Sequence, residues 1–272
     1  MKIKGHLLFL GTGASMGVPV IGCSCPVCRS TSPYNKRLRP SVLCSAGDKS
    51  LLIDCGPDFR QQALHYHIKN LNGVIFTHGH NDHTAGIDDL KIFSFRQGHP
   101  LPWLLSKDTA QDIQKRFFYL FEEGPYEDLH KHFNMQILEG ERGDVVFQDF
   151  KIHYFTYEQM QAKVTGLRFG NLAYVSDIRF FPETVFDDLE GVDTLILSAL
   201  RFSPSKMHLS IDEAIDFSLR VKAKETWFMH ISHDVDHERA NAYLPENIRM
   251  AYDGLQLEFQ AEMQKEERCN LS

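Results

Sequence analysis

Residue types that bind metal ions are concentrated in the stretch THGHNDHTAG. His78, His80, Asp82 and His83 form an H-x-H-x-D-H pattern that directly follows an apolar segment. Imidazole and carboxylate groups suit Zn, Mn or Fe ions, and a ligand set without thiolate leaves room for water and a substrate. The pattern therefore predicts a catalytic metal site; a polar loop with solvated histidines is the alternative.

A second group of ligand-type residues lies in the stretch GCSCPVC, where Cys23, Cys25 and Cys28 form a C-x-C-x-x-C pattern. Three thiolates on one short loop suit a tetrahedral zinc ion whose fourth ligand comes from elsewhere in the chain. Such a set leaves no position for a substrate, so we expect a structural zinc site. Three free, reduced cysteines are the alternative. Cys44 and Cys55 lie in or just after apolar strands, which favours small core residues.

The elements that must position these residues are short strands with helices between some of them. A helix is predicted over 57–67, another over 108–121, and a third over 210–221, which opens with the capping box of Ser210 and Glu213. This pattern favours an α+β fold with two packed sheets and helices outside them. No repeat or linker is visible, so we expect residues 1–272 to form a single domain. Strands are predicted over 6–10, 41–46, 50–54, 73–77, 151–156, 164–169, 172–175, 193–198 and 226–229.

The composition limits the classes of partner. The chain has 272 residues, of which 43% are hydrophobic, enough for a sizeable core. Its 29 Lys and Arg against 36 Asp and Glu give a net charge of −7, which disfavours a nucleic-acid polymer or an anionic membrane as the partner. No export or membrane-spanning segment is recognisable, so we expect a cytoplasmic protein with reduced or metal-bound cysteines. The oligomeric state stays open, with a homodimer as one alternative.

The histidine motif resembles that of the metallo-β-lactamase superfamily. More narrowly, the chain is similar to the branch that contains the cyclic phosphodiesterase of the phosphonate carbon–phosphorus lyase pathway. The stretches that carry this likeness reach from Phe9 to about Asp234: FLGTGASMGVPVIGCSCPVC, NKRLRPS, LLIDCGPDFR, AGIDDL, NLAYVSD and HISHD. The resemblance implies a four-layer αβ/βα sandwich of two mixed sheets flanked by helices, with a two-metal site along one edge.

The resemblance also implies which residues hold two divalent ions, zinc or manganese, at the catalytic site. The matching positions are His78 and His80 for the first metal, Asp82, His83 and His230 for the second, and Asp177 as a bridge between both. Taken alone, Asp177 is also consistent with an ordinary turn aspartate.

Two further histidines gain a role only through the resemblance. His233 matches the fourth ligand of the structural zinc, three residues beyond His230. His208 matches a histidine near the leaving group, although alone it is also consistent with an ordinary residue at a helix entry.

One position departs from the family pattern. Gln159 stands where a further histidine ligand of the first metal is expected. An amide oxygen is a poorer zinc ligand than imidazole, so the first site is expected to be weaker or to prefer a harder ion such as Mn²⁺. His153 and Glu158 are the nearest residues that could replace the missing ligand, given a local change in backbone placement.

The expected activity is hydrolysis of a small, anionic and cyclic phosphodiester by a hydroxide that the metals hold. Asp82 would orient this nucleophile, and His208 would protonate the leaving oxygen or bind a phosphoryl oxygen. The basic residues Lys36, Arg37 and Arg39 either contact phosphate or form a solvated loop. The alternatives are an RNA-end nuclease, a cofactor-biosynthesis member of the same branch, or a metal-binding protein that has lost turnover.

Overall fold

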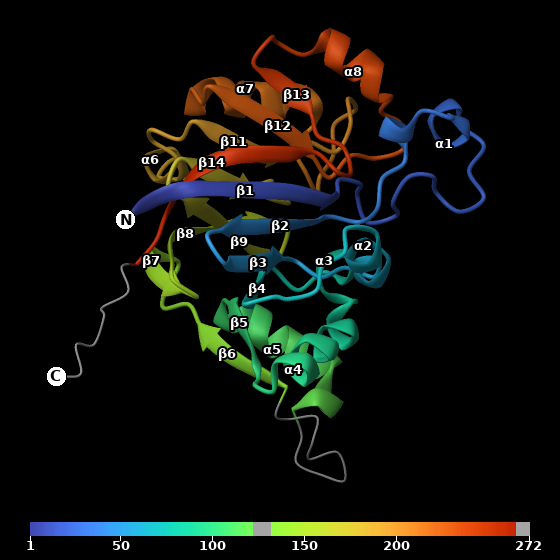
Figure 1. Cartoon of the computed structure of the whole chain (residues 1–272). Coiled ribbons are helices and arrows are strands. Elements are labelled where there is room, and N and C mark those ends of the chain that lie inside the picture. The colour runs from blue at the N-terminus through green and yellow to red at the C-terminus, as the bar shows by residue number, and fades with distance from the viewer. Residues whose placement is uncertain (122–131, 265–272) are drawn as a thin grey trace, which may run out of the picture.

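Two mixed β-sheets of seven strands each form the centre of the computed structural model, which describes residues 1–121 and 132–264 (Figure 1). The first sheet has the spatial order β14 (Gln256–Glu262), β1 (Lys2–Gly11), β2 (Ser41–Ala46), β3 (Lys49–Ile53), β4 (Gly73–Phe76), β5 (Leu101–Leu105) and β6 (Phe133–Ile137). The second has the order β13 (Ile248–Met250), β12 (Glu225–Met229), β11 (Thr194–Ser198), β10 (Leu172–Val175), β9 (Ala162–Phe169), β8 (Phe150–Gln159) and β7 (Arg142–Phe147).

The two sheets have the same plan. In each, four strands pair antiparallel and the series then continues through parallel pairs, from β3 to β6 and from β10 to β13. The connections between parallel strands carry helices, because such a connection must cross over the sheet. The helices are α1 (Pro26–Arg29), α2 (Phe59–His65), α3 (Asn81–Thr84), α4 (Lys91–Gln97), α5 (Lys107–Arg116), α6 (Val185–Asp188), α7 (Ile211–Val221) and α8 (His237–Tyr243), with short 3-10 turns η1 (Pro33–Asn35), η2 (Ile87–Leu90) and η3 (Phe118–Leu120).

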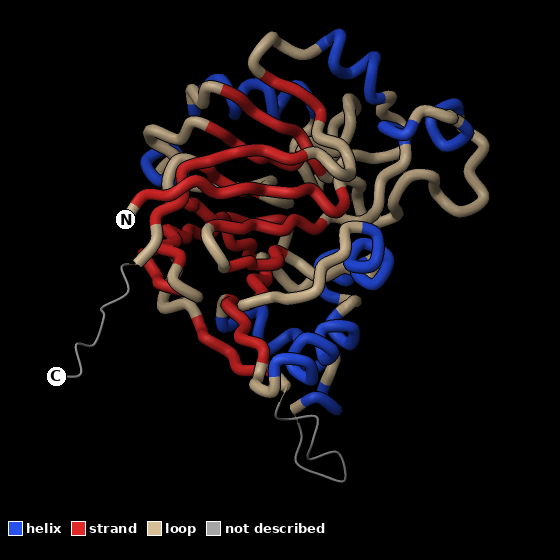
Figure 2. The backbone as a smooth tube through the Cα atoms, viewed as in Figure 1, coloured by secondary structure: helices blue, strands red, loops and turns tan. Residues whose placement is uncertain are grey.

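Three apolar clusters hold the layers together. The central cluster lies between the sheets and includes Phe9, Ile75 and Tyr174. A second cluster packs α2, α4 and α5 on the first sheet, and a third packs α6, α7 and α8 on the other. Figure 2 shows the helices outside the strands. The molecule is therefore the four-layer αβ/βα sandwich expected from the sequence.

Most of the predicted elements are present. The strand predicted over 41–46 coincides with β2, and the capping box of Ser210 and Glu213 opens α7. Sequence analysis missed β5, β6, β7, β13, β14, α1, α4, α6 and α8. In β5 the apolar run LPWLL is too short to separate strand from helix, and Pro102 argues against a strand because it lacks an N–H.

Strand ends from both sheets meet at one edge of the sandwich. The backbone N–H of Thr165, in β9, donates to the carbonyl of Thr77, just beyond β4, at 2.9 Å. Gly13, just after β1, forms a parallel bridge with Ile231, just after β12. These links fix the loops that carry the ligand-type residues. Within the described ranges, no helix is long and apolar enough to cross a membrane.

Candidate metal centre

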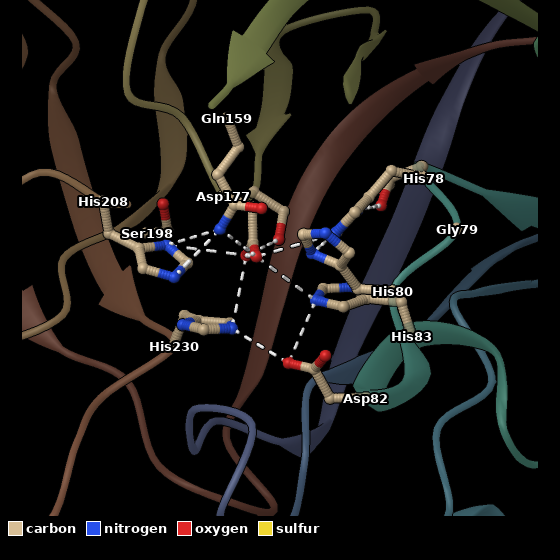
Figure 3. Close-up of polar contacts among 12 residues, drawn as sticks. His78, Gly79, His80, Asp82, His83, Gln159, Asp177, Ser198, His208 and His230 are labelled. Atoms are coloured by element: carbon tan, nitrogen blue, oxygen red, sulfur yellow. Dashed lines mark hydrogen bonds and ion pairs between the residues drawn. The ribbon is translucent and has the colours of Figure 1, made fainter. Parts of the chain in front are cut away.

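The H-x-H-x-D-H motif lies where the chain leaves β4. His78 and His80 occupy the loop, and Asp82 and His83 occupy the single turn of α3. His78, Asp82 and His83 are buried, whereas His80 is half-buried. The four side chains lie around that of Asp177, at the edge of the sandwich where the strand ends meet (Figure 3).

Asp177 lies at the centre of this group. Its Oδ2 is 3.6 Å from Nε2 of His78 and 3.6 Å from Nε2 of His83, and its Oδ1 is 3.3 Å from Nε2 of His230. The Oδ2 of Asp82 is 3.2 Å from Nε2 of His230. Two sets of ligand atoms, each set within 4.8 Å, therefore share Asp177: Asp82, His83, Asp177 and His230 on one side, and His78, His80 and Asp177 on the other.

Left-handed turns at strand ends direct several of these side chains. Asp177 follows β10 with a φ of 50°, and His230 follows β12 with a φ of 60°. Asp54 follows β3 with a φ of 62°. Such backbone is unfavourable for residues other than glycine and is found at functional sites held by the surrounding fold.

Asp54 is a member of the site that sequence analysis did not assign. Its Oδ2 accepts a hydrogen bond from Nδ1 of His83 at 2.7 Å, and its two oxygens also accept from the backbone and hydroxyl groups of Thr77 at 2.8 Å. This carboxylate fixes the His83 ring so that Nε2 faces Asp82 and Asp177. The signal was an aspartate directly after a buried strand, in LLIDCG.

Burial and the attraction between histidines and carboxylates set the protonation states of the residues in this centre. Burial lowers the pKa of His78 well below its ordinary value, so this ring is neutral. Burial alone would also lower the pKa of His83, but the carboxylates of Asp177, Asp54 and Asp82 raise it well above its ordinary value. Burial alone would raise the pKa of Asp177, yet the surrounding histidines, His230 first, hold it well below its usual range. The Asp177 carboxylate is therefore ionised.

The residues present fit a divalent cation. Nε2 of His83 is buried without a hydrogen-bond partner, although the Oδ2 atoms of Asp82 and Asp177 lie only 3.5 and 3.6 Å away. Across residues 1–121 and 132–264, every ion-pair partner of these two carboxylates is a histidine. An unsatisfied buried nitrogen costs about 1–3 kcal/mol, and a metal ion would bind it and neutralise the carboxylates.

Gln159 and His208 lie beside Asp177. Nε2 of Gln159 donates to Oδ2 of Asp177 at 3.1 Å and to Nε2 of His208 at 2.9 Å. The His208 ring stacks on His230 with a centroid distance of 4.6 Å. Burial lowers the pKa of His208 to about 4, so the ring is neutral at neutral pH.

The two proposed substitutes for Gln159 are wrong. His153 pairs with Asp144 at 2.9 Å and with Asp188 at 2.8 Å, away from the centre. Glu158 precedes Gln159 in β8, and neighbouring residues in a strand face opposite sides, so Glu158 is exposed while Gln159 is buried. Neither residue belongs to the ligand sets of this structure.

A cavity of about 700 Å³ opens beside the His78 and His80 side of the centre. His80 and Gln159 form part of its lining, and its charged residues are Asp108, Asp112 and Lys163. Lys163 is already paired with Glu141 at 2.8 Å. The wall therefore offers little unpaired positive charge.

The cysteine cluster is a separate group on the loop that precedes and includes α1, which projects from the body of the molecule (Figure 1). Sγ of Cys23 and of Cys25 lie 3.4 and 3.5 Å from Nδ1 of His233, and the four ligand atoms, including Sγ of Cys28, lie within 4.8 Å of one another. The Cys28 N–H, followed by His233, lowers the pKa of Cys25 to about 6. Burial raises the pKa of Cys28 to about 11.

The interpretation of the basic loop as a phosphate-binding element is wrong for Arg37. Its side chain is 2% exposed and donates to the hydroxyl of Thr12 at 2.7 Å and the carbonyl of Ala251 at 2.6 Å. Arg39 pairs with Asp58 at 2.9 Å. Both arginines hold the fold together. Cys44 and Cys55 are buried in the apolar clusters, as expected.

The layered fold and the two ligand sets that share Asp177 define a metal-dependent hydrolase. Residues 49–231 match the family described as the beta-lactamase superfamily domain, and the chain belongs to this family. The crystal structure of a diphosphatase from the PhnP family is 37% identical, with a TM-score of 0.89 over 97% of this chain and 100% of that one.

More distant relatives differ in name and length. An octanoyltransferase of Porphyromonas gingivalis is 32% identical over 254 residues, which are 92% of this chain and 50% of that protein. The chain thus spans about half the length of this curated relative. Zinc-bound PqqB from Methylobacterium extorquens has a TM-score of 0.73 at 18% identity over 93% of this chain and 99% of that one, a likeness in fold alone.

Proposed function

We propose that this metal-dependent hydrolase is a phosphodiesterase that acts on a small, anionic and cyclic phosphodiester. The observation that carries the proposal is the position of Asp177, whose Oδ2 lies 3.6 Å from Nε2 of both His78 and His83, one residue from each of the two ligand sets. Two ions about 4 Å apart suit the attacking and leaving oxygens of an in-line displacement at phosphorus. We also propose that residues 1–272 form a single domain.

The residues that would hold the two ions are the two sets described above, and Cys23, Cys25, Cys28 and His233 would hold a structural zinc ion. Divalent ions, zinc or manganese, would acidify water and neutralise the negative charge that builds up on the phosphoryl oxygens. The sandwich keeps this centre between the sheets, where only His80 is half-buried and the other ligand-type residues are buried.

Asp82 and His208 would supply the remaining chemistry from positions next to His230, which Asp82 approaches at 3.2 Å and on which the His208 ring stacks. The ionised Asp82 carboxylate accepts hydrogen bonds and would orient the attacking water. His208, as a neutral ring, would donate its N–H to the leaving oxygen or a phosphoryl oxygen, as neutral imidazole does in other enzymes. Water adds its oxygen to phosphorus, the ester P–O bond breaks, and the proton that the water loses ends on the leaving oxygen.

The size and charge of the neighbouring cavity favour a small substrate. Its volume of about 700 Å³ suits a ribose phosphate or a nucleotide. Asp108 and Asp112 face this space, and the chain carries a net charge of −7. Both features disfavour a polymer that presents many phosphates.

Hydrolysis of a diphosphate is the second candidate, because the PhnP-family structure of 37% identity is named a diphosphatase. The charges of the residues that line the cavity distinguish the two candidate substrates. A diphosphate carries more negative charge than a cyclic diester, and Lys163, the one Lys or Arg among the described residues that line the cavity, is already paired. We therefore favour the diester.

Bis(p-nitrophenyl) phosphate with added Mn²⁺, Ni²⁺ or Zn²⁺ is the first assay. We expect metal-dependent release of p-nitrophenol, followed by a preference for ribose cyclic phosphates or 2′,3′-cyclic nucleotides over diphosphates and RNA. A preference for diphosphates would favour the second candidate. Metal binding without turnover of any of these compounds would instead indicate a binding protein.

A further inference from the structure

The loop that carries the H-x-H-x-D-H motif is held from outside the centre by one arginine. Arg116, in the last turn of α5, donates from Nη1 to Oδ1 of Asn81 at 2.8 Å. Its Nη2 donates to the carbonyl of Gly79 and, at 3.1 Å, to the hydroxyl of Thr84. Gly79 separates the first two histidines of the motif (Figure 3). The three contacted residues lie between the ligand-type residues or directly after them, so one guanidinium restrains the whole motif.

Asp112, one turn earlier in α5, fixes the direction of this guanidinium. Its Oδ2 accepts from Nε of Arg116 at 3.0 Å and lies 2.8 Å from Nη2. The same oxygen lies so close to the loop that a Cβ on Gly79 would be 2.1 Å from it. A residue other than glycine at this position would therefore push α5 away from the loop. The absence of a side chain at Gly79 allows the ion pair to approach the metal-binding loop directly.

The three histidines of the motif are oriented by different contacts. Nδ1 of His78 lies 3.0 Å from the hydroxyl of Thr77, and Nδ1 of His83 lies 2.7 Å from Oδ2 of Asp54. Such contacts from behind fix the ring of a metal ligand. Nδ1 of His80 instead lies 3.0 Å from Nε2 of His78, which is itself a ligand-type residue.

The restraint on His80 from outside the ligand sets runs through its backbone. The carbonyl of His80 accepts a hydrogen bond from the hydroxyl of Thr84 at 2.8 Å. Thr84 is buried, and its hydroxyl oxygen accepts in turn from Nη2 of Arg116. The carbonyl of the preceding residue, Gly79, accepts from the same nitrogen. The peptide groups on both sides of His80 are thus connected to one guanidinium.

We propose that Arg116 is a positioning residue for His80: its guanidinium joins α5 to the motif loop and sets where the His80 ring stands in the centre, as Asp54 does for His83. The Asp112–Arg116 pair thereby gains a role in metal binding, although neither residue belongs to the ligand sets. The inference rests on the metal centre of the proposed function and not on the choice of substrate. Metal affinity tests it even if no phosphodiester is hydrolysed.

The first test is calorimetric titration with Mn²⁺ of protein freed of catalytic metal. Mn²⁺ is chosen because thiolates bind it poorly. The binding step that is lost in His80→Ala identifies the His80 site. Arg116→Met keeps the length of the side chain but removes its charge and its donors, and we expect it to weaken that step about 10–100-fold while the other step stays within about threefold. Both steps within threefold of wild type, or no wild-type step that depends on His80, would overturn the proposal.

The matched control is Arg220→Met. Arg220 lies in the last turn of α7, as Arg116 does in α5, and it also pairs with a carboxylate, that of Glu183. Its guanidinium lies over the Phe186 ring at 3.7 Å, remote from the motif loop. We expect a similar fall in melting temperature in the two variants and unchanged Mn²⁺ affinities in Arg220→Met. Equal losses of affinity in both variants would contradict the positioning role.

Thr84→Val tests the same connection without removing the arginine, and it serves if Arg116→Met does not fold. It removes only the hydroxyl between Nη2 of Arg116 and the His80 carbonyl. We expect the His80 step to weaken about 3–10-fold, which corresponds to the contribution of one hydrogen bond. An unchanged affinity at this step would overturn the proposal.

A double-mutant cycle tests whether Arg116 acts through His80. In a His80→Ala background, Arg116→Met should change the remaining Mn²⁺ affinity by less than about threefold, because the ligand that it positions is absent. A loss of tenfold or more in this background would show that Arg116 acts on the other ligands, and it would overturn the proposal.

Discussion

The cysteine cluster and the histidine–aspartate centre are built in opposite ways. Three of the four cysteine-site residues come from one short loop, and three of the four are half-buried. The histidine–aspartate centre draws on the ends of β4, β10 and β12, and all but His80 are buried. A local set would surround an ion on all sides, whereas a centre assembled from two sheets leaves a side open to the cavity. The comparison supports the proposal of one structural and one catalytic site.

Asp177→Ala should have the largest effect, because Asp177 belongs to both ligand sets. We expect turnover of bis(p-nitrophenyl) phosphate to fall at least about 1,000-fold, since the ions lose the carboxylate that spaces them. Circular dichroism should show an intact fold. Activity within threefold of wild type would show that Asp177 does not bridge two ions.

Asp54→Asn tests whether Asp54 orients the His83 ring in the histidine–aspartate centre. The amide is isosteric but has one oxygen in place of two, so it cannot accept all three hydrogen bonds from His83 and Thr77. We expect metal affinity to fall about 10–100-fold, as measured by calorimetric titration. Zinc at the cysteine site should be retained, and unchanged affinity at the catalytic centre would contradict the orienting role of Asp54.

Cys25→Ser tests the cysteine cluster and should have the smallest effect on turnover of the three substitutions. We expect the loss of about one equivalent of zinc, measured by elemental analysis. The melting temperature should fall by roughly 5 °C, because structural zinc contributes to folding stability. Unchanged zinc content and melting temperature would show that the cysteines are free thiols.

The sequence predicted those parts of the molecule that depend on local pattern. The motif from His78 to His83 and the cysteine loop each lie within a few residues, and the core strands are continuous apolar runs. The role of Arg37 was mispredicted because a basic residue in a loop looks the same whether its charge meets solvent or a buried acceptor. The contacts of Gln159 depend on the register of β8 against β9 and on the position of Phe180, which no local pattern reveals.

The left-handed backbone at Asp54, Asp177 and His230 has a consequence for evolution and engineering. Each such residue costs about 1–3 kcal/mol, so the fold is strained at residues that would bind metal or orient a ligand. Random selection for heat resistance alone would favour glycine or asparagine at these positions, and the scaffold would survive while its chemistry disappeared. Bound ions would stabilise the folded protein and offset part of this cost, so metal-free protein should melt at a lower temperature than loaded protein. Stability screens of this fold should therefore be run with metal present.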